Sequence, residues 1–328
     1  MEFHSSLDTA PQLKNSVLTL GSFDGLHYGH KRLIERLLQC SKTLQVPSVL
    51  ITFHPHPKEV LLRDKKIPVE LLTTIEEKRK IIENGLQIDH TVILPFTQEL
   101  SQVTALNFLK QYIIDPFSPS EIVIGHDHNF GKDREGNAEF LAQHEDDFGY
   151  STIPIDAVSL SDNQDHVVSS SLIRDLLKNG RTLDAIDFLT RPYQVSGVVK
   201  QGAQRGRTLN FPTANIHPSS ENKLLPQDGI YLVYVTGENA DCYGACSIGW
   251  RPTFDNQEHA VEVFLLAEPD TSLYSEKLTL HFFHRLRDEL KFEQVEDLVD
   301  QMHKDIAQCE DIIQNENPWR HYQEELVT

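Results

Sequence analysis

The sequence has few sulfur-containing residues and no C-x-x-C pair. Its 328 residues include 4 cysteines and 2 methionines. Cys40, Cys242, Cys246 and Cys309 do not have the spacing of a zinc-binding or redox-active pair. They are therefore expected to be reduced thiols in the cytoplasm rather than parts of a disulfide framework.

Long apolar segments and a surplus of basic residues are also lacking. No apolar run approaches the roughly 20 residues that cross a bilayer. Residues 1–14 carry neither the basic start nor the apolar stretch of a signal peptide. The net charge of −19 argues against general nucleic-acid binding. It still permits the binding of a single nucleotide, which needs only a local positive site and often Mg²⁺. The sequence indicates no particular oligomeric state.

The length favours two domains, and the pattern of the first half indicates α/β structure. Apolar strand-like runs alternate with helical patterns from residue 17 to residue 155. Glu77 completes a capping box before a helix that is expected to end near residue 85. Another helix is expected over residues 104–114, with Leu106 and Phe108 on its apolar side. Strands are expected at 49–53, 90–94 and 121–124. Such alternation predicts a doubly wound parallel sheet.

The pattern changes in the second half. Five short strand-like runs leave no room for crossover helices, so we expect an antiparallel barrel or sandwich. An amphipathic helix is expected over residues 295–313. The expected domains are residues 1–186 and 187–328. The five runs cover residues 194–200, 229–235, 243–248, 260–266 and 277–283.

Residues 21–30 are the most informative segment. They lie between an apolar strand and an amphipathic helix, and a glycine-rich turn at that place forms an anion site. The turn is expected to present backbone N–H groups to a phosphate, which the helix dipole also favours. His27 and His30 lie one helical turn apart if the helix begins near Tyr28. The alternative is a pair of surface histidines beside an ordinary turn.

Two later segments of the first half also have phosphate- or nucleotide-binding character. The polar loop 125–136 follows a strand and has Phe130 as its apolar anchor, which favours a ligand-binding loop over a metal cluster. Ser170 and Ser171 stand near a helix start, with Arg174 one turn later. Their hydroxyls and the guanidinium can hold phosphate oxygens. A plain serine N-cap with a solvated arginine is equally compatible with the pattern.

In the second half, Thr213 and Asn215 follow a segment that contains the glycine Gly206 and the cation Arg207. Alternate residues of a strand share a face, so both oxygens can reach one Mg²⁺–nucleotide. Glu262 is a carboxylate in an apolar strand, which is costly without a role. Partial burial would raise its pKa toward that of a general base. The alternative for the Thr213 segment is a plain turn followed by a barrel strand. The alternative for Glu262 is a charge on an edge strand that opposes aggregation.

Residues 15–185 resemble the adenylyltransferase module of the bacterial bifunctional riboflavin kinase/FAD synthetase family, an HxGH nucleotidylyltransferase fold. Residues 21–30 match its G-x-F-D-G-x-H-x-G-H pattern. The resemblance implies that His27 and His30 bind ATP phosphates. Two departures are His128, where the family usually has phenylalanine, and Val167, where a basic residue often stands. The resemblance also implies ligand contacts for Gly21, Phe23, Asp24, Gly25, Asp127, Phe130, Ser170, Ser171 and Arg174.

Residues 190–315 resemble the riboflavin kinase module of the same family. Residues 206–215 match G-R-T-x-G-F-P-T-A-N, with Asn210 in place of the second glycine of the motif. The resemblance implies that Glu262 is the catalytic base and that Arg287 lies near the flavin. It assigns Mg²⁺–ATP to Thr213 and Asn215, and nucleotide binding also to Gly206 and Thr208.

The two resemblances together imply a cytoplasmic enzyme with two separate active sites. One phosphorylates riboflavin to FMN, and the other adenylylates FMN to FAD, both with ATP and Mg²⁺. His128 and Val167 motivate an alternative, a riboflavin kinase whose N-terminal module is impaired in adenylyl transfer. Further alternatives are a nucleotidylyltransferase for a pantetheine or nicotinate substrate, and a non-catalytic flavin-binding regulator.

Overall fold

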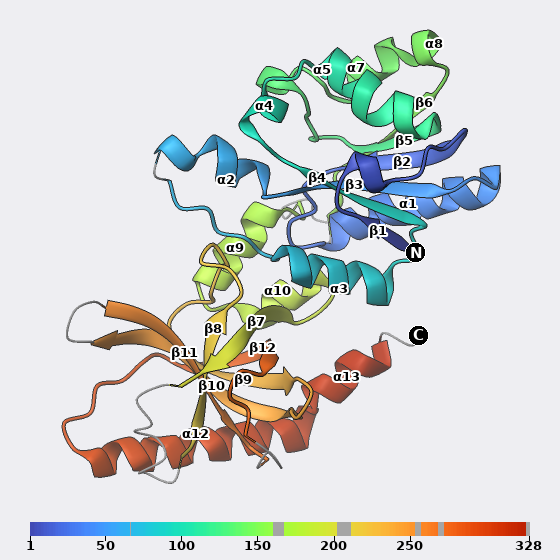
Figure 1. The fold of residues 1–328 in the computed structure, drawn as a ribbon. Helices are drawn as coiled ribbons and strands as arrows, with labels where there is room; N and C mark the ends of the chain where they lie inside the picture. The colour runs from blue at the N-terminus through green and yellow to red at the C-terminus, as the bar shows by residue number, and fades with distance from the viewer. Residues whose placement is uncertain (66, 160–166, 202–210, 253–256, 268–271, 326–328) are drawn as a thin grey trace. The chain divides into compact units, whose positions relative to one another are not determined.

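The computed structural model describes residues 1–65, 67–159, 167–201, 211–252, 257–267 and 272–325. The chain divides into two compact units, Met1–Ser170 and Ser171–Thr328, and each contains its own sheet (Figure 1). The division falls after the first residue of helix α9 (Ser170–Lys178) and before helix α10 (Thr182–Leu189), whereas the sequence places the boundary after residue 186. No helix among the described residues has the length and apolar character required to cross a membrane.

The first unit contains a six-stranded parallel sheet with the order β1-β4-β3-β2-β5-β6. The strand β2 lies between β3 and β5, so the chain winds outward from β2 in both directions. The doubly wound parallel sheet predicted from the sequence is therefore confirmed. Its strands are β1 (Glu2–His4), β2 (Ser16–Leu20), β3 (Ser48–His54), β4 (His90–Pro95), β5 (Pro119–Gly125) and β6 (Ser151–Ile155).

Both faces of this sheet are covered, as the alternation of its buried residues requires. Leu18 and Ile51 belong to one core cluster, while Val17 and Leu50 belong to a second. Helix α1 packs against β2, β3 and β5. The helical segments of this unit are η1 (Leu7–Thr9), α1 (Tyr28–Leu44), α2 (Pro57–Leu61), η2 (Arg63–Lys65), α3 (Ile75–Gly85), α4 (Gln98–Ser101), α5 (Ala105–Phe108), η3 (Leu109–Ile114), α6 (Asp115–Phe117), η4 (Lys132–Arg134), α7 (Ala138–Gln143) and α8 (Glu145–Phe148).

One helix differs from its sequence-based prediction. The segment expected to be a single helix over residues 104–114 is α-helical in α5 and π-helical in η3, and the short α-helix α6 follows it. Phe108 is buried as predicted, but Leu106 is 44% exposed. The buried stripe runs through Ala105, Leu109 and Ile113, which leaves Leu106 on the other side of the helix.

The second unit contains a closed antiparallel barrel with the strand order β10-β11-β8-β7-β12-β9. Five of its strands correspond to the five predicted runs. The sixth is β8, the segment that carries Thr213 and Asn215. Figure 1 shows the long helix α12 lying along the outside of the barrel. The elements are β7 (Tyr193–Lys200), β8 (Thr213–Pro218), β9 (Gly229–Thr236), β10 (Asp241–Pro252), β11 (Gln257–Leu265), β12 (Lys277–Arg287), α12 (Val295–Glu316) and α13 (Pro318–Glu325).

Candidate active sites

The loop after β2 lies where the winding direction of the first sheet reverses. Ligands of open α/β sheets bind at this point, beyond the carboxyl ends of the strands. Helix α1 begins at Tyr28, as predicted, and His27 is its N-cap residue. The sequence therefore placed the loop correctly at both the end of a strand and the start of a helix.

The two histidines of this loop form one compact pair. The rings of His27 and His30 stack with 3.7 Å between their centroids and 19° between their planes. The ring of Phe23 meets His30 edge-on at 5.2 Å. A Cβ atom on Gly29 would lie 3.3 Å from the His27 ring, so a larger residue there would disturb the pair. Both imidazoles can therefore act on the same phosphate group.

The backbone of the loop is held in an unusual conformation. Phe23 and Leu26 have φ angles of 45° and 42°, although side chains of this size rarely adopt the left-handed region. Both side chains are almost completely buried. Burial of two large apolar side chains offsets the local strain and holds the loop in this shape.

Asp24 points inward and ties the loop to the segment before α3. Its carboxylate, only 1% exposed, accepts hydrogen bonds from the backbone N–H groups of Leu72 and Thr73 at 3.0 Å each. In return, the N–H group of Gly25 donates to Thr73 Oγ1 at 3.1 Å. Asp24 thus holds the loop in place through its bonds to the segment before α3.

This arrangement corrects one sequence-based expectation. The turn was expected to offer its backbone amides to a phosphate, but the Gly25 amide is bonded to Thr73, and the Gly21 amide donates to Ile51 O at 3.0 Å. The expectation is wrong for these two amides because the loop uses them to fasten itself to the sheet. For the histidines and the N-terminus of α1, phosphate binding stays a prediction.

Lys78 is a functional candidate that the sequence analysis missed. It lies on α3, and its Nζ donates to Ser22 O at 2.5 Å and to Thr52 Oγ1 at 3.2 Å. Burial lowers the pKa of this amine to about 8, against the opposing effect of the Asp24 and Glu59 charges. The available signal was its spacing, since Lys78 occupies a core-facing position of α3 together with Ile82.

The serine segment reaches the same loop. Ser170 Oγ donates to Asp24 O at 2.9 Å, which joins residues 146 positions apart in the sequence. Ser171 and Arg174 follow on α9, in the second unit. Val167, at the position of a common basic residue, is exposed. The structure therefore brings Ser170 to the histidine loop, and the shared roles of Ser171 and Arg174 stay predictions.

In the loop after β5, Asp127 and Phe130 differ in their exposure to solvent. The side chain of Asp127 is 81% exposed, whereas Phe130 is buried and its ring contacts Phe108 and Phe140. Phe130 thus anchors the loop in the core. Burial also lowers the pKa of His128 to about 4, so its ring is uncharged at neutral pH and stacks on Phe130 with 6.4 Å between centroids. An uncharged imidazole can therefore replace the phenylalanine that the family resembled by this chain usually has at this position.

In the barrel, the predicted catalytic group and nucleotide-binding groups lie on neighbouring strands. Glu262 of β11 is paired with Asn215 of β8. Thr213 Oγ1 donates to Glu262 Oε2 at 3.0 Å, and all three side chains are partly buried. Gly206 and Thr208 lie outside the described residues. The structure therefore brings together a carboxylate, a hydroxyl and an amide, which is an oxygen-rich set that suits Mg²⁺.

Arg287 is engaged with α12. Its guanidinium forms a two-pronged ion pair with Asp305, with Nε and Nη2 at 2.7 and 2.6 Å from the carboxylate oxygens. Asp305 is buried and was not singled out from the sequence. This pair fixes the end of β12 to α12, and a role of Arg287 near a flavin stays a prediction.

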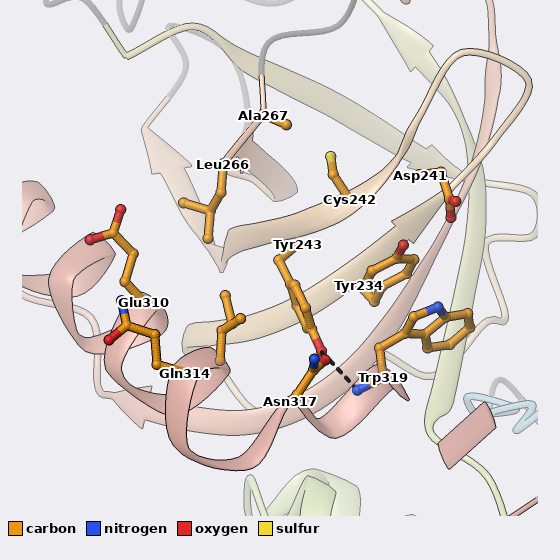
Figure 2. A pocket seen from close by; sticks show the side chains of 11 residues that line it. Tyr234, Asp241, Cys242, Tyr243, Leu266, Ala267, Glu310, Gln314, Asn317 and Trp319 are labelled. Carbon is orange, nitrogen blue, oxygen red and sulfur yellow. Dashed lines mark hydrogen bonds between the residues drawn. The ribbon is translucent and has the colours of Figure 1, made fainter. Parts of the chain in front are cut away.

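The described part of the barrel also has an open pocket of about 500 Å³ at its contact with the C-terminal helices (Figure 2). Tyr234 stacks on Trp319 with 4.3 Å between ring centroids. The Tyr243 hydroxyl donates to Asn317 Oδ1 at 3.0 Å and accepts from the backbone N–H of Trp319 at 2.8 Å. None of the residues predicted for catalysis lines this pocket, and these contacts fasten the junction of α12 and α13 to the barrel.

Comparison with known proteins gives the same two-part division. The profile of the FAD synthetase family matches residues 9–172, and that of the riboflavin kinase family matches residues 189–313. A bifunctional riboflavin kinase/FMN adenylyltransferase from Listeria monocytogenes is 34% identical over 89% of this chain and 90% of its own length. The protein of that name from Bacillus subtilis is 33% identical over 88% and 90%.

A solved structure is similar over nearly the whole chain. A crystal structure described as a macrolide-efflux protein from Streptococcus pneumoniae has a TM-score of 0.80 and 28% sequence identity. The similarity covers 96% of this chain and 98% of that chain. The pairing of the parallel sheet with the barrel therefore recurs in a solved structure.

Proposed function

Since this chain belongs to the bifunctional riboflavin kinase/FMN adenylyltransferase family, we propose that its two units perform the two named reactions at separate active sites. Residues 1–186 would form the FMN adenylyltransferase and residues 187–328 the riboflavin kinase. The observation that carries this proposal is that each family's motif residues form their own compact group, one at the histidine loop and one on β8 and β11. The extent of the match to relatives favours both activities over kinase activity alone.

In the kinase unit, Glu262 takes the proton from the 5′-hydroxyl of riboflavin. The hydroxyl oxygen then forms a bond to the γ-phosphorus of ATP, and the bond to the β–γ bridging oxygen breaks to release ADP. Thr213 and Asn215 would hold Mg²⁺ with the nucleotide, and the bound ion would neutralise charge on the phosphate oxygens. The hydrogen bond from Thr213 to Glu262 supports this arrangement, because it holds the proposed base beside the oxygens that would bind Mg²⁺.

In the adenylyltransferase unit, a phosphate oxygen of FMN forms a bond to the α-phosphorus of ATP, and pyrophosphate leaves. The stacked His27 and His30 donate to phosphate oxygens and stabilise the charge that develops on them, with no covalent enzyme intermediate. Ser170, Ser171 and Arg174 would hold the same nucleotide. Mg²⁺ is proposed for this step too.

The two assignments can be tested by separating the products riboflavin, FMN and FAD over time. Glu262→Gln is expected to lower FMN formation from riboflavin by at least about 100-fold, while FAD formation from supplied FMN stays within about twofold. His30→Ala is expected to have the opposite pattern, because it removes a phosphate donor only from the first unit. Loss of both activities in Glu262→Gln, with the fold intact by circular dichroism, would contradict separate sites.

The proposed compartment is the cytoplasm, where ATP is available and thiols are kept reduced. All four cysteines are free thiols in the structure, which supports this assignment.

A further inference from the structure

Three possible metal ligands gather at the edge of the first sheet, away from the histidine loop. Glu2 and His4 lie on β1, and His90 begins β4, with Glu2 directly paired to His90 in the strand register. One ligand atom from each residue lies within 4.8 Å of the other two. The cluster lies at the amino end of β4, whereas the histidine loop follows the carboxyl end of β2.

The distances between these atoms suit a small divalent cation. His4 Nε2 lies 3.3 Å from His90 Nδ1, and Glu2 Oε2 lies 3.4 Å from His90 Nδ1 and 3.7 Å from His4 Nε2. In a tetrahedral zinc site, ligand atoms about 2.0–2.2 Å from the metal lie about 3.3–3.6 Å from one another. The cluster therefore needs almost no rearrangement to hold such an ion.

A neighbouring contact prepares His4 as a ligand. Its Nδ1 lies 2.8 Å from Thr9 O, so Nδ1 carries the proton and donates to this carbonyl. The lone pair is then on Nε2, which faces His90 and Glu2. Metal-binding histidines in proteins have this second hydrogen bond, which fixes both the tautomer and the ring orientation.

The burial of the three residues leaves one side of the cluster open. His4 is buried, His90 is partly buried and Glu2 is exposed. Two imidazoles and one carboxylate are a ligand set for zinc and related transition metals rather than for Mg²⁺. Water or a small anion can occupy the fourth position.

We propose that Glu2, His4 and His90 form a zinc-type metal site that fastens the three-residue edge strand β1 to β4. Because the cluster and the histidine loop lie at opposite ends of the sheet, we assign the ion a part in holding β1 rather than a part in the adenylyl step. The metal-free alternative is a simple hydrogen bond in which His90 Nδ1–H donates to His4 Nε2.

The test uses the full-length chain without an affinity tag, treated with a chelator and then freed of it. Zn²⁺ is titrated in competition with a chromophoric chelator, and thermal unfolding is followed with and without Zn²⁺, in the absence of ATP. The wild type is expected to bind one Zn²⁺ per chain and to unfold at a higher temperature when it is bound.

Variants separate this site from adventitious binding. His90→Gln is expected to weaken Zn²⁺ binding by at least about 100-fold and Glu2→Gln by about 10-fold, and His90→Gln should remove the thermal shift. His321→Gln, at an exposed histidine of α13, is the matched control and should behave as wild type. If His90→Gln folds poorly, the exposed Glu2→Gln still decides the matter. Equal Zn²⁺ affinity in the wild type and Glu2→Gln, or no zinc-dependent shift in the wild type, would overturn the proposal.

Discussion

Lys78 has a buried amine that is bonded directly to the backbone of the histidine loop. It is 5% exposed, and its Nζ holds the carbonyl of Ser22 within the loop. Burial lowers the pKa of the amine to about 8, so it loses its charge at a pH where exposed lysines remain protonated. We therefore expect Lys78 to influence the adenylyl step as a positioning residue, through the loop.

We expect FAD formation from FMN to fall as the pH rises above about 8, because the uncharged amine holds the Ser22 carbonyl less strongly. Lys78→Met should lower kcat/KM for this step by about 10- to 100-fold and flatten that limb of the pH profile. The measurement is the initial rate of FAD formation across pH, with the exposed Lys80→Met on the same helix as control. An unchanged alkaline limb in Lys78→Met would disprove the link.

His128 should make the first unit sensitive to acid. Burial lowers its pKa from 6.5 to about 4. Between these values the unfolded chain binds a proton that the folded chain does not bind, so the free energy of unfolding falls as the pH falls. The loss begins below about pH 6.5 and reaches at most about 3 kcal/mol near pH 4, because one pKa unit corresponds to about 1.4 kcal/mol.

His128→Phe is expected to reduce this acid destabilisation while leaving FAD formation at neutral pH within about threefold of wild type, since an uncharged ring replaces an uncharged ring. Urea unfolding of the two proteins at several pH values measures the effect. The exposed His126→Phe is the control. A pH dependence of stability that is identical in His128→Phe and wild type would show that another group is responsible.

At the level of elements, strong periodic patterns predicted the structure well and short elements were missed. The capping box of Thr74 and Glu77 is present, and α3 ends at Gly85, as predicted. Strand β1 was not predicted, because three residues are too few to show an alternating pattern. Its existence depends on pairing with β4, a long-range contact that local sequence does not encode.

The sequence predicts only part of each candidate site, because local patterns do not encode long-range contacts. His27, His30, Thr213 and Glu262 stand in continuous motifs, so the sequence alone singles them out, and their catalytic roles stay predictions. Lys78 and Asp305 lie on other elements, α3 and α12, where they bond Ser22 of the histidine loop and Arg287 of β12 respectively. Only the folded arrangement shows that a lysine on one helix holds a loop that lies 56 positions earlier in the sequence.

At the scale of the whole molecule, the net charge of −19 opposes the approach of anionic substrates. ATP and FMN are anions, whereas riboflavin is neutral. Salt screens long-range repulsion, with a Debye length of about 30 Å at 0.01 M and about 8 Å at 0.15 M. The effect of ionic strength should therefore depend on which substrate is varied.

Raising the ionic strength from about 0.01 to about 0.15 M should lower KM for FMN in the adenylyl step by about two- to threefold. KM for riboflavin in the kinase step should stay constant and serves as the internal control. Steady-state kinetics at fixed Mg²⁺ and saturating ATP measure both. A KM for FMN that rises with salt would mean that the local positive charge of the site outweighs the charge of the molecule.

The inward-facing Asp24 has a consequence for the motions of the histidine loop. Amide protons of Gly25, Leu72 and Thr73 are committed to bonds within the protein, and such amides exchange with deuterium only when the structure opens. Substrate-handling loops commonly exchange early. In this loop the three amides should exchange about as slowly as those of the neighbouring strands. We therefore expect the loop to stay closed and rigid throughout the catalytic cycle.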